Sequence, residues 1–162
     1  MMRKNSRKVF IVIQPLQYLQ ALELRDDNDY NFLVALWANE SSQLHRLIDK
    51  KHWNKIIFLP YRGLAFELIK NSVAIRHLIK DIGQCDEIIV SSYYSEFMNL
   101  IANANPTSEV IVLEDGNATL IMDSNKHYKT TKFLVKRFIL KLLGFDINAI
   151  EKPTLFILER DT

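Results

Sequence analysis

The sequence predicts a doubly wound α/β domain with a parallel sheet and helices on both of its faces. Short runs of apolar, β-branched residues alternate along the chain with segments of helical periodicity, the order that produces parallel strands joined by crossover helices. The strand-like runs are apolar almost throughout, as expected of strands that are covered on both faces. A chain of 162 residues fits one domain over 1–162.

In the first third of the chain, strands and helices alternate between proline signals. Pro15 starts the first helix, because proline is tolerated in a first helical turn, and Pro60 closes the third strand. The predicted elements are a strand at Val9–Ile13, a helix at Leu16–Leu24, a strand at Asn31–Trp37, a helix at Glu40–Lys51 and a strand at Lys55–Leu59.

The rest of the chain continues the alternation. Gly83 ends a long helix, and Asn105-Pro106 stops the next one. The predicted elements are a helix at Gly63–Ile82, a strand at Asp86–Ser91, a helix at Ser95–Ala104, a strand at Glu109–Leu113, an extended piece at Ala118–Met122 and a helix at Thr130–Leu143, followed by a last apolar run at Thr154–Leu158.

Charge and cysteine content limit the classes of partner that the chain is expected to bind and the compartment in which it is expected to lie. The net charge is +2, but six Lys or Arg and no acid lie between Ser124 and Phe145, so the remainder of the chain carries −4. This is not the general basicity of a nucleic-acid binder, and we expect no nucleic-acid partner. The single Cys85 excludes an internal disulfide. The first apolar run is too short for a signal segment or a membrane span, so we expect a cytoplasmic protein.

The fifth predicted strand ends in two adjacent acids and a glycine, in the stretch VIVLEDGNATL. A turn needs only one Asp or Asn before its glycine, so the second acid is surplus. Neighbouring carboxylates disfavour joint ionisation, which suits a general base that deprotonates a hydroxyl. Gly116 would let the backbone turn tightly and leave the site open. The same residues also fit an Asp-Gly turn leading into Asn117–Met122, and local sequence leaves both interpretations open.

Other signals of function are few. Open parallel sheets bind ligands at the carboxyl ends of their strands. No GxGxxG follows the first strand and no GxxxxGK[ST] occurs, which removes the main support for dinucleotide and P-loop sites. No CxxC, HExxH or His pair at ligand spacing indicates a metal, so we expect no metal and no cofactor. Ser92 and Tyr93, at the end of the fourth strand, fit a sugar subsite or a simple loop.

Two segments together carry a family resemblance. VFIVIQPLQYLQALEL resembles a strand, a Thr/Ser-Pro-Leu/Phe-Gln-type turn and a helix, and VIVLEDGNATL resembles an Asp/Glu-Asp/Glu-Gly motif that ends a later strand. These features are similar to those of the bacterial sialyltransferases of glycosyltransferase family 52 and the related capsular polysialyltransferases. The resemblance implies a GT-B fold, in which two Rossmann-like domains face each other across a cleft. It also implies metal-independent, inverting transfer of sialic acid from CMP-sialic acid to a sugar hydroxyl.

Residue by residue, the resemblance assigns roles at two strand ends. Asp115 would be the general base, with Glu114 beside it in the motif and Gly116 and Asn117 next to the substrate. The acceptor would lie near the turn after the first strand, at Pro15, Leu16 and Gln17. The acceptor would be a glycan of lipooligosaccharide or capsule type.

The resemblance is incomplete in one respect. The family's second signature is a His-Pro dipeptide in a C-terminal nucleotide-sugar domain, and no histidine here precedes a proline. A GT-B enzyme also needs about twice this length. We therefore expect an N-terminal, acceptor-side domain that is inactive alone and needs a C-terminal domain as its partner. A non-catalytic Rossmann-like binding module, or a GT-B transferase that uses another nucleotide sugar, are the alternatives.

The basic segment KTTKFLVKRFILKLLGF adds a second expected partner. A helical wheel places five apolar residues on one side, namely Leu134, Val135, Phe138, Ile139 and Leu142. The basic residues lie on the other side, with Phe133 and Leu140 among them. Basic residues interleaved with exposed apolar ones suit the inner face of a bacterial membrane, contacted peripherally through Lys129–Lys141. A core-packed helix with a solvated basic face is the alternative.

Overall fold

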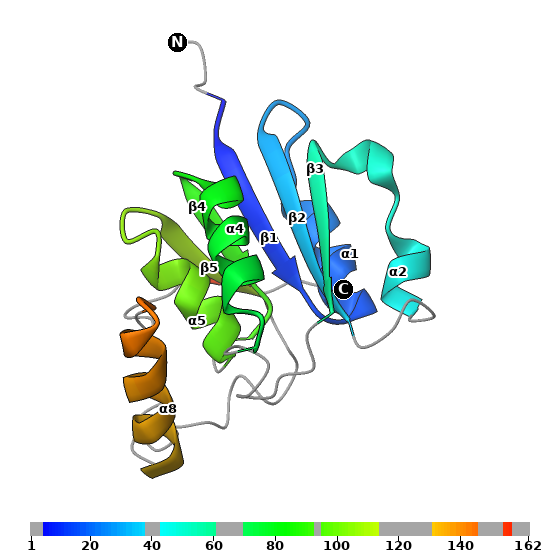
Figure 1. Cartoon of the computed structure of the whole chain (residues 1–162). Coiled ribbons are helices and arrows are strands. Elements are labelled where there is room, and N and C mark those ends of the chain that lie inside the picture. Colours follow the sequence, from blue (N-terminus) through cyan, green and yellow to red (C-terminus); the bar gives the residue numbers. More distant parts are fainter. Residues whose placement is uncertain are drawn as a thin grey trace.

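The computed structural model describes residues 5–37, 43–60, 70–92, 95–113, 131–145 and 154–156, which form a Rossmann-like α/β domain (Figure 1). All strands pair in parallel, in the order β3-β2-β1-β4-β5-β6. The strands are β1 (Arg7–Val12), β2 (Tyr30–Trp37), β3 (Lys55–Pro60), β4 (Glu87–Val90), β5 (Glu109–Leu113) and β6 (Thr154–Phe156). The predicted fold class is therefore confirmed.

Helices cover both faces of this sheet. They are α1 (Pro15–Leu24), α2 (Gln43–Leu47), α4 (Ser72–Ile82), α5 (Glu96–Asn103) and α8 (Thr131–Leu142), with a 3₁₀ turn at Lys50–His52. Buried residues of α1 and α2 pack on one face of the sheet, and buried residues of α4, α5 and α8 pack on the other. None of the helices in the described ranges is long and apolar enough to cross a membrane.

The central strand β1 shows why the sequence specifies this sheet. Val9, Phe10, Ile11 and Val12 have no solvent exposure at all. Val9 and Ile11 pack toward α4 and α5, while Phe10 and Val12 pack toward α1 and α2. Successive side chains of a strand point to opposite faces, so only an unbroken apolar run fills both layers.

One predicted helix is interrupted, and another is described only in its second half. The predicted helix Glu40–Lys51 is α2 followed by the 3₁₀ turn, with residues 38–42 outside the described part. Asp49 separates the two because its backbone is extended and its side chain accepts a hydrogen bond from the Lys51 amide at 3.1 Å. Of the helix predicted at Gly63–Ile82, the described part contains α4 from Ser72, preceded by a turn at Asn71 and a helical Lys70. Residues 61–69 and the predicted piece Ala118–Met122 lie outside the described residues.

Helix α8 is oriented differently from the wheel-based prediction. Leu140, expected among the basic residues, is fully buried in the core on the α4–α5 face of the sheet. Leu143 packs partly buried against the same core, and Phe145 is buried just after the helix. The larger apolar side of α8 therefore points away from the domain. The Phe133 side chain lies outside the described part.

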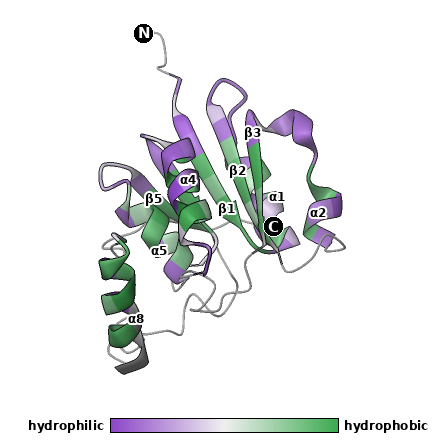
Figure 2. Cartoon of the chain, viewed as in Figure 1, coloured by the Kyte–Doolittle hydropathy of each residue, from purple (hydrophilic) through white to green (hydrophobic). Residues whose placement is uncertain are grey.

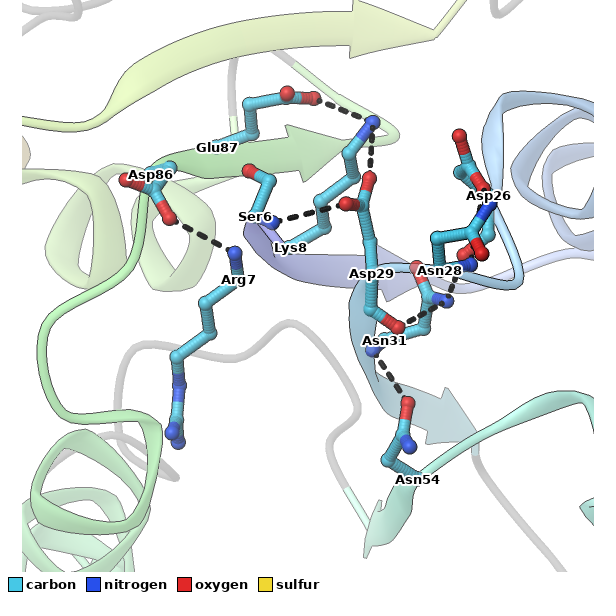
Figure 3. A network of polar contacts seen from close by, with 10 residues as sticks. All are labelled: Ser6, Arg7, Lys8, Asp26, Asn28, Asp29, Asn31, Asn54, Asp86 and Glu87. Atoms are coloured by element: carbon cyan, nitrogen blue, oxygen red, sulfur yellow. Dashed lines mark hydrogen bonds and ion pairs between the residues drawn. The ribbon is translucent and has the colours of Figure 1, made fainter. Parts of the chain in front are cut away.

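Polar side chains fix the amino-terminal edge of the sheet (Figure 3). The Lys8 ammonium on β1 lies 3.3 Å from an Asp29 carboxylate oxygen, just before β2, and 3.3 Å from a Glu87 carboxylate oxygen on β4. Asp29 also accepts a hydrogen bond from the Ser6 amide at 2.9 Å. The Asp86 carboxylate accepts a hydrogen bond from the Arg7 amide at 2.8 Å. These contacts join β1, β2 and β4 at the edge opposite the one where such sheets bind ligands.

Candidate functional site at the carboxyl edge of the sheet

The strand order reverses between β1 and β4, which makes their carboxyl ends the place where a ligand is expected. The chain runs from β2 to β3 on one side of β1, and from β4 to β5 and β6 on the other. Helix α1 leaves the end of β1 on one face of the sheet, and α5 leaves the end of β4 on the opposite face. The amino-terminal turns of both helices therefore lie at this edge (Figure 1).

Gln17 connects the two strand ends. Its side-chain Oε1 accepts hydrogen bonds from the amides of Ile13 and Gln14, both at 2.9 Å. Its Nε2 donates to the carbonyl of Ser91, at the end of β4, over 3.4 Å. The side chain is buried, with an exposed fraction of 2% for the residue. Gln17 thus lies at the predicted edge, and its amide ties the turn after β1 to the end of β4.

The neighbouring residues Pro15 and Leu16 form the outer part of this turn. Pro15 occupies the first turn of α1, as the sequence predicts, and is partly buried. Leu16 is 57% exposed, and Ile13 before the turn is also exposed. A ligand at this edge would therefore meet the apolar Leu16 and Ile13 side chains before it reached the buried Gln17 amide.

A serine-rich loop after β4 forms the other side of the edge. The Ser92 amide donates to the sulfur of Met98 at 3.2 Å, and the buried Ser91 hydroxyl lies 3.8 Å from the same sulfur. The Ser95 side chain caps α5 by accepting a hydrogen bond from the Met98 amide at 3.4 Å. Ser92 is half-buried. Of the two residues of the predicted sugar subsite, it is the one that lies within the described part of the chain. Tyr93 lies outside the described residues.

The predicted catalytic residues follow β5. Strand β5 ends at Leu113, which is fully buried, and Val112 pairs with Val90 of β4. Glu114, Asp115, Gly116 and Asn117 lie outside the described residues. Their assignment as catalytic and substrate-binding residues stays a prediction.

The described part of the edge has a definite chemical character. Its residues at 13–17, 91–92 and 95 are apolar or neutral and polar. They can pack against a ligand and form hydrogen bonds, but they include no carboxylate or imidazole that could act as a general base. The next residue, Glu96 in the first turn of α5, adds one carboxylate to the described part of this edge. Within the described residues, no group of three His, Cys, Asp or Glu side chains could hold a metal ion.

One described cavity lies elsewhere. It has a volume of about 340 Å³ and is lined by Arg76 of α4, Asn103 of α5 and Phe145, among others. The Arg76 guanidinium donates to the Leu143 carbonyl and lies over the Phe145 ring, 5.4 Å from its centre. These contacts attach the end of α8 to α4. The cavity therefore lies between helices, away from the candidate site at the carboxyl edge of the sheet.

Sequence reasoning missed the structural role of Gln17, although a signal was present. Gln17 is the third residue of α1, and a Gln or Glu at this position commonly bonds back to the residue before the helix. The role of Met98 under the serine loop had no comparable signal, because a methionine in an apolar helix reads simply as core.

Comparisons of the chain with protein-family models, with curated proteins and with solved structures give no match. The fold shown by the described residues is a Rossmann-like α/β domain with a parallel sheet. The resemblance to family 52 sialyltransferases stays a prediction, which the experiments below test.

Proposed function

We propose that the chain is the N-terminal, acceptor-side domain of a sialyltransferase-like GT-B glycosyltransferase, with Asp115 as its general base. The observation that carries the proposal is the acid pair that continues the chain directly from Leu113, the last residue of β5. The end of β5 neighbours the end of β4 in a sheet whose ligand edge is the β1–β4 reversal. The uncharged turn held by Gln17 is the acceptor side of that edge in this proposal.

The proposed step is an inverting displacement. Asp115 takes the proton from an acceptor hydroxyl while the hydroxyl oxygen bonds to the anomeric carbon of CMP-sialic acid. The bond from that carbon to the phosphate oxygen breaks, and CMP leaves with the bonding electron pair. Glu114 is the residue before the base, and its negative charge favours uptake of a proton by the Asp115 carboxylate. The second domain binds the nucleotide, as the family resemblance implies.

The decisive experiment replaces Asp115 in the complete enzyme. Asp115→Asn keeps the shape of the side chain but removes the base, so kcat for sialic acid transfer should fall by about 10²- to 10⁴-fold. Asp123→Asn, an equivalent change eight residues further on, should leave kcat unchanged. Circular dichroism melting checks that both variants fold. Near-normal transfer by Asp115→Asn would refute the assignment.

The second domain can be sought in the gene itself. The proposal expects the reading frame to continue past Thr162 for roughly another domain and to include a His-Pro dipeptide. A stop codon directly after Thr162 would contradict the enzyme proposal for this chain. Assays with other nucleotide sugars then separate a sialyltransferase from a GT-B transferase with a different donor.

A binding module without catalysis is the second candidate. It is favoured by the neutral residues at 13–17 and 91–92, where exposed Leu16 and half-buried Ser92 suit glycan contact without proton transfer. In that case glycan binding, measured by calorimetry, would persist in Asp115→Asn, and no donor sugar would be consumed by any form of the protein.

A further inference from the structure

Helix α8 exposes a continuous apolar surface, here named the α8 apolar face. Five large apolar residues contribute to it, namely Leu134, Val135, Phe138, Ile139 and Leu142. Phe138 is 64% exposed and Leu142 is 73% exposed. With 3.6 residues per turn, the five positions fall within one arc of less than half the helix circumference. Figure 2 shows hydrophobic residues along the visible side of α8, on the outside of the domain.

This exposure follows from the way α8 is attached. The opposite side of the helix packs on the core through the fully buried Leu140 and the partly buried Leu143. Arg76 of α4 holds the carboxyl end by its contacts with the Leu143 carbonyl and the Phe145 ring. Since the helix is fixed by its narrower apolar side, its wider apolar side is left to the solvent. Soluble domains seldom leave a contiguous apolar surface uncovered without an interaction to use it.

The charge around this face indicates the kind of partner. Arg137 and Lys141 are exposed and lie one turn apart on one flank of the α8 apolar face. The segment from Ser124 to Phe145 carries six Lys or Arg and no acid, whereas the rest of the chain is net negative. An apolar stripe beside basic side chains matches an anionic bilayer, which has an apolar acyl interior and anionic headgroups at its surface.

We propose that α8 docks this domain on the surface of an anionic lipid bilayer. The apolar face enters the boundary between headgroups and acyl chains, while Arg137 and Lys141 contact anionic headgroups. A twelve-residue helix is about 18 Å long, shorter than the ~30 Å hydrocarbon core, so it lies in the plane of the surface. The inference does not depend on glycosyl transfer and holds or fails independently of the proposed function.

Vesicle flotation of the purified chain tests the proposal. The chain should float with vesicles of equal parts phosphatidylglycerol and phosphatidylcholine, and not with vesicles of phosphatidylcholine alone. Raising the salt concentration should weaken binding, because the basic flank contributes by charge. Replacing both Phe138 and Leu142 by Ser should lower the partition coefficient at least about thirtyfold. The double charge reversal Arg137→Glu with Lys141→Glu should lower it to a similar degree, at least about thirtyfold.

Matched controls come from the opposite face of the sheet. Leu19 of α1 and Leu47 of α2 are 50% and 47% exposed, and Leu19→Ser with Leu47→Ser should leave vesicle binding unchanged. Arg46→Glu with Lys50→Glu, a charge reversal at exposed positions, should also leave it unchanged. All these positions are exposed, so each variant should melt at the temperature of the parent chain.

Three results would overturn the proposal. One is the absence of binding to anionic vesicles. Another is binding that the two α8 variants do not weaken. The third is a concentration-dependent dimer, seen by light scattering, that the α8 variants abolish while vesicles are not bound. That last result would make the α8 apolar face an interface between copies of this chain.

Discussion

Removing Lys8 should destabilise the domain strongly, although it deletes a single charged side chain. The Lys8 ammonium lies 3.3 Å from carboxylate oxygens of both Asp29 and Glu87, and its side chain is only 11% exposed (Figure 3). Lys8→Met keeps the apolar stem but leaves the Asp29 carboxylate, 4% exposed, without its cation. Loss of one member of a buried ion pair typically costs about 3–5 kcal/mol.

The lower end of that range applies here. Glu87 is 24% exposed, so water can solvate it after the change, and Asp29 keeps its hydrogen bond from the Ser6 amide. We therefore expect Lys8→Met to lower the free energy of unfolding by about 3 kcal/mol. Adding Asp29→Asn removes the stranded charge, so the double variant should recover to within about 1 kcal/mol of the parent.

Urea unfolding at neutral pH measures these differences, with the fluorescence of the buried Trp53 as the signal. Lys80→Met, at an exposed position of α4, is the control and should change the free energy of unfolding by less than about 0.5 kcal/mol. The reasoning would be refuted if Lys8→Met cost less than about 1 kcal/mol, or if the double variant were no more stable than Lys8→Met alone.

Two further predictions concern buried polar groups. Gln17→Ala removes the oxygen that accepts two 2.9 Å hydrogen bonds from backbone amides and should lower the free energy of unfolding by about 2 kcal/mol; a loss below about 0.5 kcal/mol in urea unfolding would contradict the assignment. Burial raises the pKa of the Cys85 thiol, with the nearby Ser108 hydroxyl opposing this in part, so iodoacetamide should alkylate the native thiol far more slowly than the urea-unfolded one at pH 8. Because the pKa of the Cys85 thiol is raised in the folded state, the stability linked to this thiol is present at neutral pH and is lost as the pH rises through that pKa. A native thiol that reacts as fast as the unfolded one would contradict this account.

The sheet could be predicted from the sequence because each of its central strands contributes side chains to the apolar core on both faces of the sheet. The run Val9–Val12 is apolar at every position, and every one of these side chains is buried. Helix ends were less predictable where a polar side chain competes for backbone hydrogen bonds. Asp49 interrupts a helix in this way, and the apolar periodicity around it gives no sign of the interruption.

Long-range contacts could not be predicted from local pattern. A helical wheel shows that α8 has apolar residues, but the side that faces the domain is decided by Leu140 and by Arg76, which come from helices far apart in the sequence. Lys8 reads as a solvent-exposed residue before a strand until Asp29 and Glu87 are brought beside it. At the candidate site, the turn geometry around Gln17 was within reach of sequence reasoning, while the role of Asp115 still depends on experiment.

The parallel strand order also has a consequence for how the chain is made. Strand β1 is central, and its partner β4 emerges late, since Arg7 and Asp86 at the starts of the two strands are 79 residues apart. At about 5–20 residues per second, a ribosome needs roughly 4–16 s to cover that distance. Throughout this interval one edge of Val9–Val12 has no native neighbour and can pair with the same segment of another nascent chain. The yield of correctly folded protein should therefore depend on how closely ribosomes follow one another on the message.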